Sequence, residues 1–100
     1  MNKSPMEIQR NKQIRGQILA TLELSHPMAT PQASVSSALI SAMMIQNPDI
    51  TPYVDYLEDR GYVRVFRVPD AVGGEMAALK LTSKGVDVLE ETITDDGVDI

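Results

Sequence analysis

The stretch from Ile50 to Gly85 constrains the fold most, because it contains the signals of a helix, a hairpin and a second helix in direct succession. Helical spacing of apolar residues leads to Gly61, and a glycine adopts the positive φ that often ends a helix. Two segments with strand character then flank the loop 69–74, and Thr82 offers a side chain that can cap the next helix. We therefore expect a β-hairpin held between two helices.

The hairpin is predicted over Tyr62–Val68 and Glu75–Leu81. β-Branched, aromatic and arginine residues fill the first segment, and the second alternates between two faces, as strands do. Helical spacing after the second strand predicts a last helix that runs to about Thr92. The acidic tail 94–100 is expected to be flexible, so that the ordered core spans about residues 5–93.

Two helices are predicted in the first half of the chain. The first is expected over residues 5–24, because Ser4 can cap a free amide and the proline after it suits the first helical position. The second begins near Pro31 or Ser34 and stops by Gln46. Serines rather than charges fill the polar face of this second helix, which favours contact with another chain.

The third helix, which ends at Gly61, has two possible starts. Asn47-Pro48 and Thr51-Pro52 each offer a capping side chain followed by a proline at the first helical position. Apolar spacing favours the earlier start, but Pro52 would then lie inside the helix and bend it. The sequence leaves both starts open.

The composition predicts one globular domain over residues 1–100. Hydrophobic residues make up 43% and charged residues 23%, which is near the globular average and unlike a disordered chain. No apolar run approaches the roughly 20 residues that cross a bilayer, and the first residues lack the apolar region of a secretory signal. We therefore expect a cytoplasmic protein without a membrane partner.

Catalysis and metal binding are not expected. The chain has no cysteine, which excludes disulfides, thiolate zinc sites and thiol nucleophiles. Its one histidine, His26, has no partner for a metal site, and the sequence contains neither a glycine-rich phosphate loop nor a serine with a base-bearing motif. We predict no catalytic residues, no metal, no cofactor and no identifiable small-molecule ligand.

Two motifs flank the hairpin: YLEDRGYV over residues 56–63 and LKLTSKG over residues 79–85. From about Ile14 to Thr92 the chain resembles bacterial winged helix-turn-helix regulators of the ArsR and MarR type, most closely the short ArsR-like proteins of Mu-like prophages. The resemblance implies an α+β, mainly α fold with three N-terminal helices, a two-stranded β-hairpin wing and a C-terminal helix. The cysteines of metal-responsive ArsR proteins are absent, so metal sensing is not implied.

The same resemblance implies a transcriptional regulator of phage or prophage origin that binds double-stranded DNA as a homodimer. The third helix would enter the major groove and the hairpin would follow the backbone. The implied DNA-binding residues are Thr51, Tyr53, Tyr56, Arg60, Arg64 and Arg67. Arg60 could instead pair with a neighbouring carboxylate, and Arg64 and Arg67 point to different faces if their strand is regular.

The charge pattern favours an alternative function. The net charge is −5, and the outward positions of the third helix include Asp49, Asp55 and Asp59, which repel phosphates. The alternative is a winged-helix protein-interaction module that uses its acidic third-helix face to bind a basic protein partner and does not bind DNA.

The cations of the first helix and the methionines form two further groups of residues. The cations Arg10, Lys12 and Arg15 are expected to form a solvated face of the first helix. The six methionines, which include the pair Met43-Met44, are expected mainly to fill gaps in the core, with at least one buried between chains.

Overall fold

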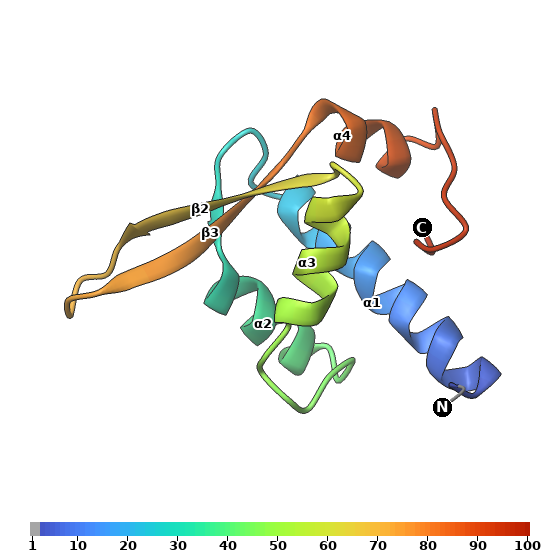
Figure 1. Ribbon diagram of the computed structural model, residues 1–100, viewed down its shortest axis with the longest axis horizontal. Helices are drawn as coiled ribbons and strands as arrows, with labels where there is room; N and C mark the ends of the chain where they lie inside the picture. Colours follow the sequence, from blue (N-terminus) through green and yellow to red (C-terminus); the bar gives the residue numbers. More distant parts are fainter. Residues whose placement is uncertain (1–2) are drawn as a thin grey trace.

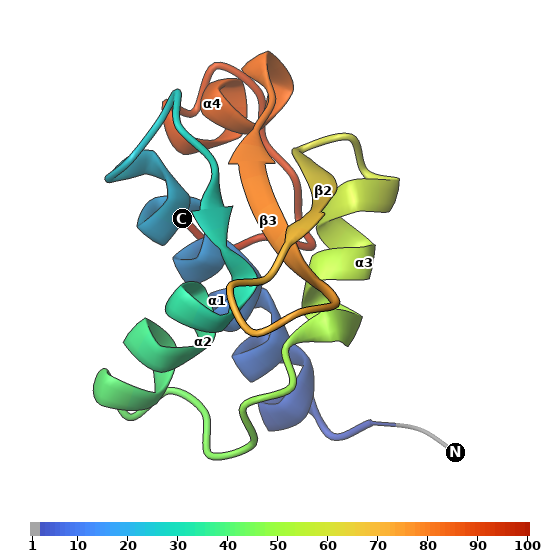
Figure 2. The ribbon, with the colours of Figure 1, turned by 90° about the vertical axis from the view of Figure 1, so that its left-hand side faces the viewer.

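The computed structural model describes residues 3–100 as a helical body from which a long hairpin projects (Figure 1). The elements in chain order are α1 (Pro5–Glu23), β1 (Thr30–Pro31), α2 (Gln32–Ser41), α3 (Thr51–Asp59), β2 (Val63–Pro69), β3 (Glu75–Leu81) and α4 (Ser83–Leu89). A quarter turn brings the hairpin toward the viewer and shows the helices grouped around the base of the sheet (Figure 2). Within residues 3–100, no helix combines the length and the apolar character that crossing a membrane requires.

The predicted hairpin is present as β2 and β3, but the sheet has three strands in the order β1-β3-β2, so the expectation of only two strands is wrong. The register of β2 and β3 runs from Val63 opposite Leu81 to Pro69 opposite Glu75, and β1 pairs with the other edge of β3. The third strand escaped prediction because β1 contains only Thr30 and Pro31, too few residues for any alternation. A proline, which donates no ladder hydrogen bond, suits this edge position.

The first helix begins as its cap predicts. The Ser4 hydroxyl oxygen accepts a hydrogen bond from the Glu7 backbone N–H at 3.2 Å, and Pro5 occupies the first helical position. Four residues apart, Ile14, Ile18 and Leu22 form a stripe that is at most 1% exposed. α2, α3, α4 and β3 all pack against α1, so this stripe lies at the centre of the core.

The third helix takes the later of its two possible starts. Thr51 is its first residue and Pro52 its second, so Thr51 does not cap the helix as predicted; Ile50 holds the cap position, and the Thr51 backbone N–H donates to an Asp49 carboxylate oxygen at 3.0 Å. At the other end Gly61 has φ +79°. The Gly61 N–H donates to the Glu58 carbonyl at 2.9 Å and the next N–H to the carbonyl of Leu57 at 2.9 Å, a Schellman motif that closes the helix.

α2 starts at Gln32, directly after Pro31, and ends at Ser41, within the predicted limit of residue 46. α4 ends at Leu89, earlier than the predicted end near residue 92. Met43 and Glu91 each have φ 60°, the left-handed conformation that terminates a helix. Such turns need no glycine, so the sequence carried no clear signal for them.

One hydroxyl group joins the two ends of the hairpin. The Thr82 hydroxyl donates to the Gly61 carbonyl at 2.6 Å and accepts the Gly85 backbone N–H at 3.0 Å, which caps α4. The Thr82 backbone N–H donates to the carbonyl of Tyr62 at 3.0 Å. The ends of α3 and β3 and the start of α4 are therefore fixed to one another.

The C-terminal tail, which was expected to be flexible, packs against α1. Val98 is 7% exposed and belongs to the hydrophobic core, and the Asp99 backbone N–H donates to the Lys12 carbonyl at 3.1 Å. Gly16 leaves room for this contact, since a Cβ at that position would lie 1.8 Å from the Asp99 carbonyl oxygen. Two apolar residues, Val98 and Ile100, among acidic ones give no helical or strand pattern of useful length, which is why the sequence predicted a loose tail.

We expect Gly16→Ala to lower the free energy of unfolding by about 1–3 kcal/mol, because the added methyl group must push the tail away. Urea denaturation measures the change. With a loose tail the same substitution would instead stabilise α1 by roughly 1 kcal/mol through helix propensity. Gln17→Ala, on the exposed side of α1, is the matched control and should not destabilise the domain.

Candidate nucleic-acid interface

The outward face of α3 is acidic. Val54 and Leu57 are buried, whereas the exposed positions of the helix are Thr51, Pro52, Asp55, Glu58 and Asp59. Asp49, just before the helix, is exposed as well, and hydrogen bonds from the Thr51 side chain and backbone hold the pKa of its carboxyl group below the usual value. The helix therefore presents carboxylates where DNA binding would require donors.

The two tyrosines of α3 are half-buried rather than presented outward. Tyr53 and Tyr56 pack against the edge of the hydrophobic core. The guanidinium carbon of Arg15 lies 3.7 Å from the centre of the Tyr56 ring, and that of Arg60 lies 4.9 Å from it. Tyr56 thus already holds two cations by cation–π contact within the domain.

Arg60 forms an ion pair with a carboxylate from the C-terminal tail. Its guanidinium nitrogen lies 3.3 Å from an Asp95 carboxylate oxygen, and the Asp95 side chain is only 7% exposed. The same carboxylate accepts hydrogen bonds from the Tyr62 hydroxyl and from the Gly97 backbone N–H. Among residues 3–100 no other ion pair lies within 4 Å, so Arg60 does pair with a carboxylate, but with one from the tail and not with a neighbour in the sequence.

Arg15 is also held by the tail. Its guanidinium donates to the Gly97 carbonyl at 3.0 Å, and Gln9 donates to the Asp99 carboxylate at 2.9 Å. The expectation that Arg10, Lys12 and Arg15 form a solvated face is therefore wrong for Arg15, which is half-buried. We call residues 95–99 the C-terminal clasp, because they join α1 to the end of α3.

Opposing effects set the pKa of Asp95. Burial by itself raises the pKa of this carboxyl group, but hydrogen bonds from Tyr62 and Gly97 and the positive charges of Arg60 and Arg15 outweigh burial and leave the pKa below its usual value. Burial, followed by the hydrogen bond to Asp95 and the charge of that carboxylate, raises the pKa of Tyr62 to about 12. The clasp is therefore built for an ionised Asp95 beside a neutral Tyr62.

The other two arginines of the predicted DNA-binding set, Arg64 and Arg67, lie on opposite faces of β2. Arg64 lies opposite Lys80 and Arg67 opposite Ala77, so the two arginines point to opposite faces of β2, as expected for a regular strand. Both arginines are exposed. Lys80 shares a face with Arg64 but was not singled out from the sequence, because only the strand register reveals that they are partners.

The six predicted DNA-binding residues therefore do not form one surface. Thr51, Arg64 and Arg67 are exposed, Tyr53 and Tyr56 are half-buried, and Arg60, whose side chain is 51% exposed, is paired with Asp95. In the part of the chain that the structure describes, no group of three or more His, Asp or Glu side chains could hold a metal ion.

The arrangement of helices and sheet is similar to that of solved transcription regulators. A PadR-like transcription factor from Bacteroides fragilis matches with a TM-score of 0.71 and 19% identity over 87% of this chain and 82% of its own. The chain has a winged-helix fold. A candidate transcriptional regulator from Thermoplasma acidophilum matches with a TM-score of 0.67 and 15% identity over 78% of this chain and 74% of its own.

A MarR transcription factor from Planctomyces limnophilus is also similar to this winged-helix chain, with a TM-score of 0.55 and 22% identity over 91% of this chain and 76% of its own. At such identities the likeness concerns the fold. No protein-family model matches the sequence. No curated protein sequence matches it at a significant level. The finer resemblance to ArsR-like proteins of Mu-like prophages stays a prediction.

We expect Asp95→Asn to lower the free energy of unfolding by about 2 kcal/mol at pH 7, because the charge that Arg60 and Tyr62 contact is lost. The folded-state pKa of Asp95 is depressed, so its contribution is present above the unfolded value of about 3.9 and is lost as the pH falls through the lower folded value. Urea denaturation from pH 7 to pH 2 should show the two proteins converging at the acid end. Asp96→Asn, at the exposed neighbouring position, is the control, and equal effects of both substitutions would contradict the clasp.

Proposed function

We propose that this chain is a cytoplasmic transcriptional regulator of phage or prophage origin that binds double-stranded DNA as a homodimer. The observation that supports the proposal is its winged-helix fold together with the likeness to three regulators. In this mode α3 lies in the major groove and the hairpin follows the backbone. The contacting residues would come from Thr51, Tyr53, Tyr56, Arg60, Arg64 and Arg67.

These residues are not equally available. Thr51 is exposed at the start of α3, and Arg64 and Arg67 are exposed on the wing. Arg60 would have to leave Asp95 to reach a phosphate, and Tyr56 is held by two arginines. The exposed wing arginines therefore provide most of the attraction, and the carboxylates of α3 oppose it.

A fluorescence-anisotropy titration with duplexes from the neighbouring genomic DNA tests this proposal. We expect Arg67→Gln to weaken binding and to reduce the slope of log K against log salt by about 1. Asp55→Asn should strengthen binding, because it removes a carboxylate from the α3 face. Glu90→Gln, which removes an exposed carboxylate next to α4, is the control. Absence of salt-sensitive binding at micromolar protein would contradict DNA binding.

A second function is favoured by the acidity of α3. Asp55, Glu58 and Asp59 are exposed on one short helix, and the arginine that follows them is paired with Asp95. Such a surface is complementary to a basic protein. A pull-down assay should then lose the partner when both Asp55 and Asp59 are changed to Lys. If the double variant still binds every partner of the wild type, the acidic face is not the docking site.

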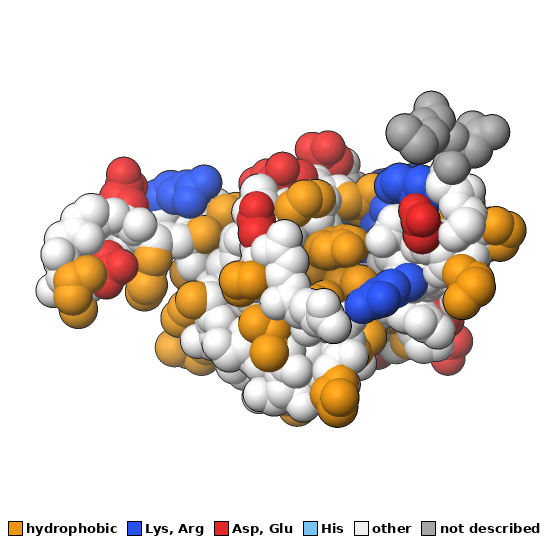
Figure 3. Space-filling view, turned by 90° about the horizontal axis from the view of Figure 1, so that it is seen from below, with side chains coloured by type: hydrophobic (Ala, Val, Ile, Leu, Met, Phe, Trp, Pro, Cys, Tyr) orange, Lys and Arg blue, Asp and Glu red, His pale blue; other side chains and the backbone are white. Residues whose placement is uncertain are grey.

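Exposed apolar side chains support the homodimer. Met6 on α1 is 83% exposed and Met43 after α2 is 90% exposed, and both line one surface groove of about 780 Å³ together with Ile14 and Met44. Figure 3 views the molecule from the side on which α2 lies and shows hydrophobic side chains spread over that face. Methionine side chains adapt to a partner surface, so this groove is the face that we assign to the second copy.

We expect Met43→Glu to shift the chain from dimer to monomer, because burying a carboxylate between two copies removes its hydration and the apolar contacts of the methionine. Sedimentation velocity over a range of concentrations measures the shift, and circular dichroism checks folding. Val72→Glu is the matched control, since Val72 is 92% exposed at the tip of the hairpin. A dimer that survives Met43→Glu unchanged, or a wild-type chain that is monomeric at high concentration, would refute this interface.

A further inference from the structure

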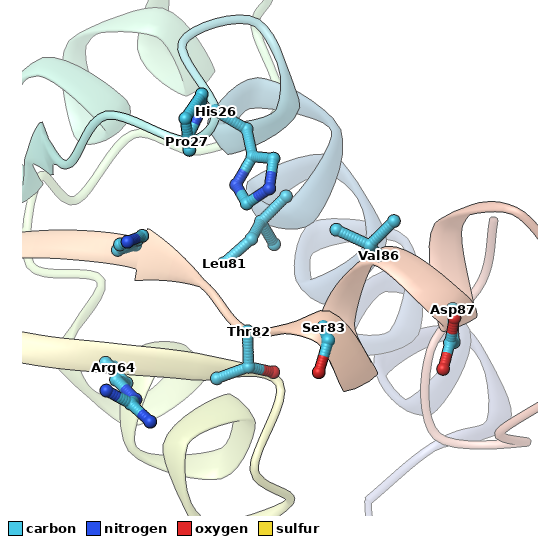
Figure 4. Close-up of a pocket in the computed structure, with 9 residues that line it drawn as sticks. His26, Pro27, Arg64, Leu81, Thr82, Ser83, Val86 and Asp87 are labelled. Carbon is cyan, nitrogen blue, oxygen red and sulfur yellow. The ribbon is translucent and has the colours of Figure 1, made fainter.

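A surface pocket of about 590 Å³ lies where the base of the hairpin meets the α1–β1 loop and α4. Figure 4 shows the loop residue His26 above the strands, Arg64 on β2, and Ser83 where α4 begins. Segments that are far apart in the sequence supply its polar lining, which includes His26, Arg64, Lys80, Thr82, Ser83 and Asp87.

Two cations on neighbouring strands line the pocket side by side. Arg64 and Lys80 are register partners in β2 and β3, so their side chains leave the same face of the sheet with Cβ atoms roughly 4.5–5.5 Å apart. Like charges in this arrangement destabilise a sheet. Within residues 3–100 neither cation has a carboxylate within 4 Å, since the ion pair at that distance joins Arg60 to Asp95.

Positive charge is outnumbered by negative charge in this molecule. The chain has a net charge of −5, and two of its arginines, Arg15 and Arg60, are held by the C-terminal clasp. An anion between Arg64 and Lys80 would remove the repulsion between them and satisfy their donors. A bound anion therefore explains an arrangement that is otherwise unfavourable.

The chemistry of the lining selects the kind of anion. A guanidinium presents a planar fork that matches phosphate oxygens, and an ammonium beside it adds a second charge, so together they suit a doubly charged group. The Thr82 hydroxyl is occupied by Gly61 and Gly85, whereas the Ser83 hydroxyl is exposed. Asp87 lies at the α4 side of the pocket, which places the anion at the strand side (Figure 4).

We propose that this pocket binds a phosphate group between Arg64 and Lys80. A backbone phosphate of DNA and a free phosphate offer the same chemistry. The first source rests on the proposed function, in which Arg64 contacts DNA, and the second does not depend on it.

An NMR titration with inorganic phosphate at constant ionic strength tests the pocket without DNA. We expect saturable shifts of the backbone amides of Arg64, Lys80 and Ser83, because these residues surround the anion. Arg64→Gln and Lys80→Gln should each raise the dissociation constant at least about tenfold, since each removes a charged hydrogen bond. Lys12→Gln, which removes a positive charge on α1 outside this pocket, is the matched control and should leave the dissociation constant unchanged.

Shifts that do not saturate, or that appear unchanged in Arg64→Gln and Lys80→Gln, would show general ionic effects and no site. The spectra themselves report whether each variant is folded. Arg64→Lys provides a second variant that keeps the charge and loses the fork, and it should bind more weakly than the wild type but more tightly than Arg64→Gln.

A parallel titration with a short DNA duplex separates the two sources. If the phosphate belongs to DNA, the duplex shifts the same amides, and Arg64→Gln and Lys80→Gln each reduce the salt slope of binding by about 1. If inorganic phosphate shifts them and the duplex does not, the pocket takes free phosphate, and the DNA proposal stands or falls on its own titration. If neither ligand shifts them, the pocket is not a phosphate site.

Discussion

The burial of one apolar stripe on α1 holds this domain together. Ile14, Ile18 and Leu22 are at most 1% exposed, and three other helices and the central strand pack on the helix that carries them. Removing a side chain of this kind from water contributes about 1.5–3 kcal/mol. The hairpin has no comparable core of its own: its base is buried through Val63, Leu79 and Leu81, and its far half is exposed. The wing is therefore ordered because its base rests on the helical body.

The electrostatics of the surface follow from how the arginines are used. Arg15 and Arg60 contact one tyrosine ring and the C-terminal clasp, so both guanidinium groups are engaged within the domain. The surface carries an acidic α3 and, apart from it, cations on α1, on α4 and on the wing, among them the pair Arg64 and Lys80 at the base of the sheet. This distribution distinguishes the molecule from a winged helix whose third helix is basic, and it explains why fold and charge favour different functions.

Local signals in the sequence predicted the elements whose causes are local. Ser4 and Thr82 mark the helix starts that their hydroxyl groups cap, and the predicted second hairpin strand has the observed bounds, Glu75–Leu81. The features that escaped prediction depend on contacts between distant residues. β1 exists because it meets β3, and the clasp exists because Asp95 meets Tyr62 and Arg60. No periodicity in a short acidic or proline-containing segment reveals such partners.

The joint made by Thr82 has a mechanical consequence. Its hydroxyl and backbone N–H tie the strand that returns from the wing to the two residues that leave α3, while the same hydroxyl anchors α4. The hairpin is thus attached to the helical body through this residue. A force applied at the tip of the hairpin is transmitted to the C-terminal turn of α3 and to α4 together, instead of bending a flexible hinge.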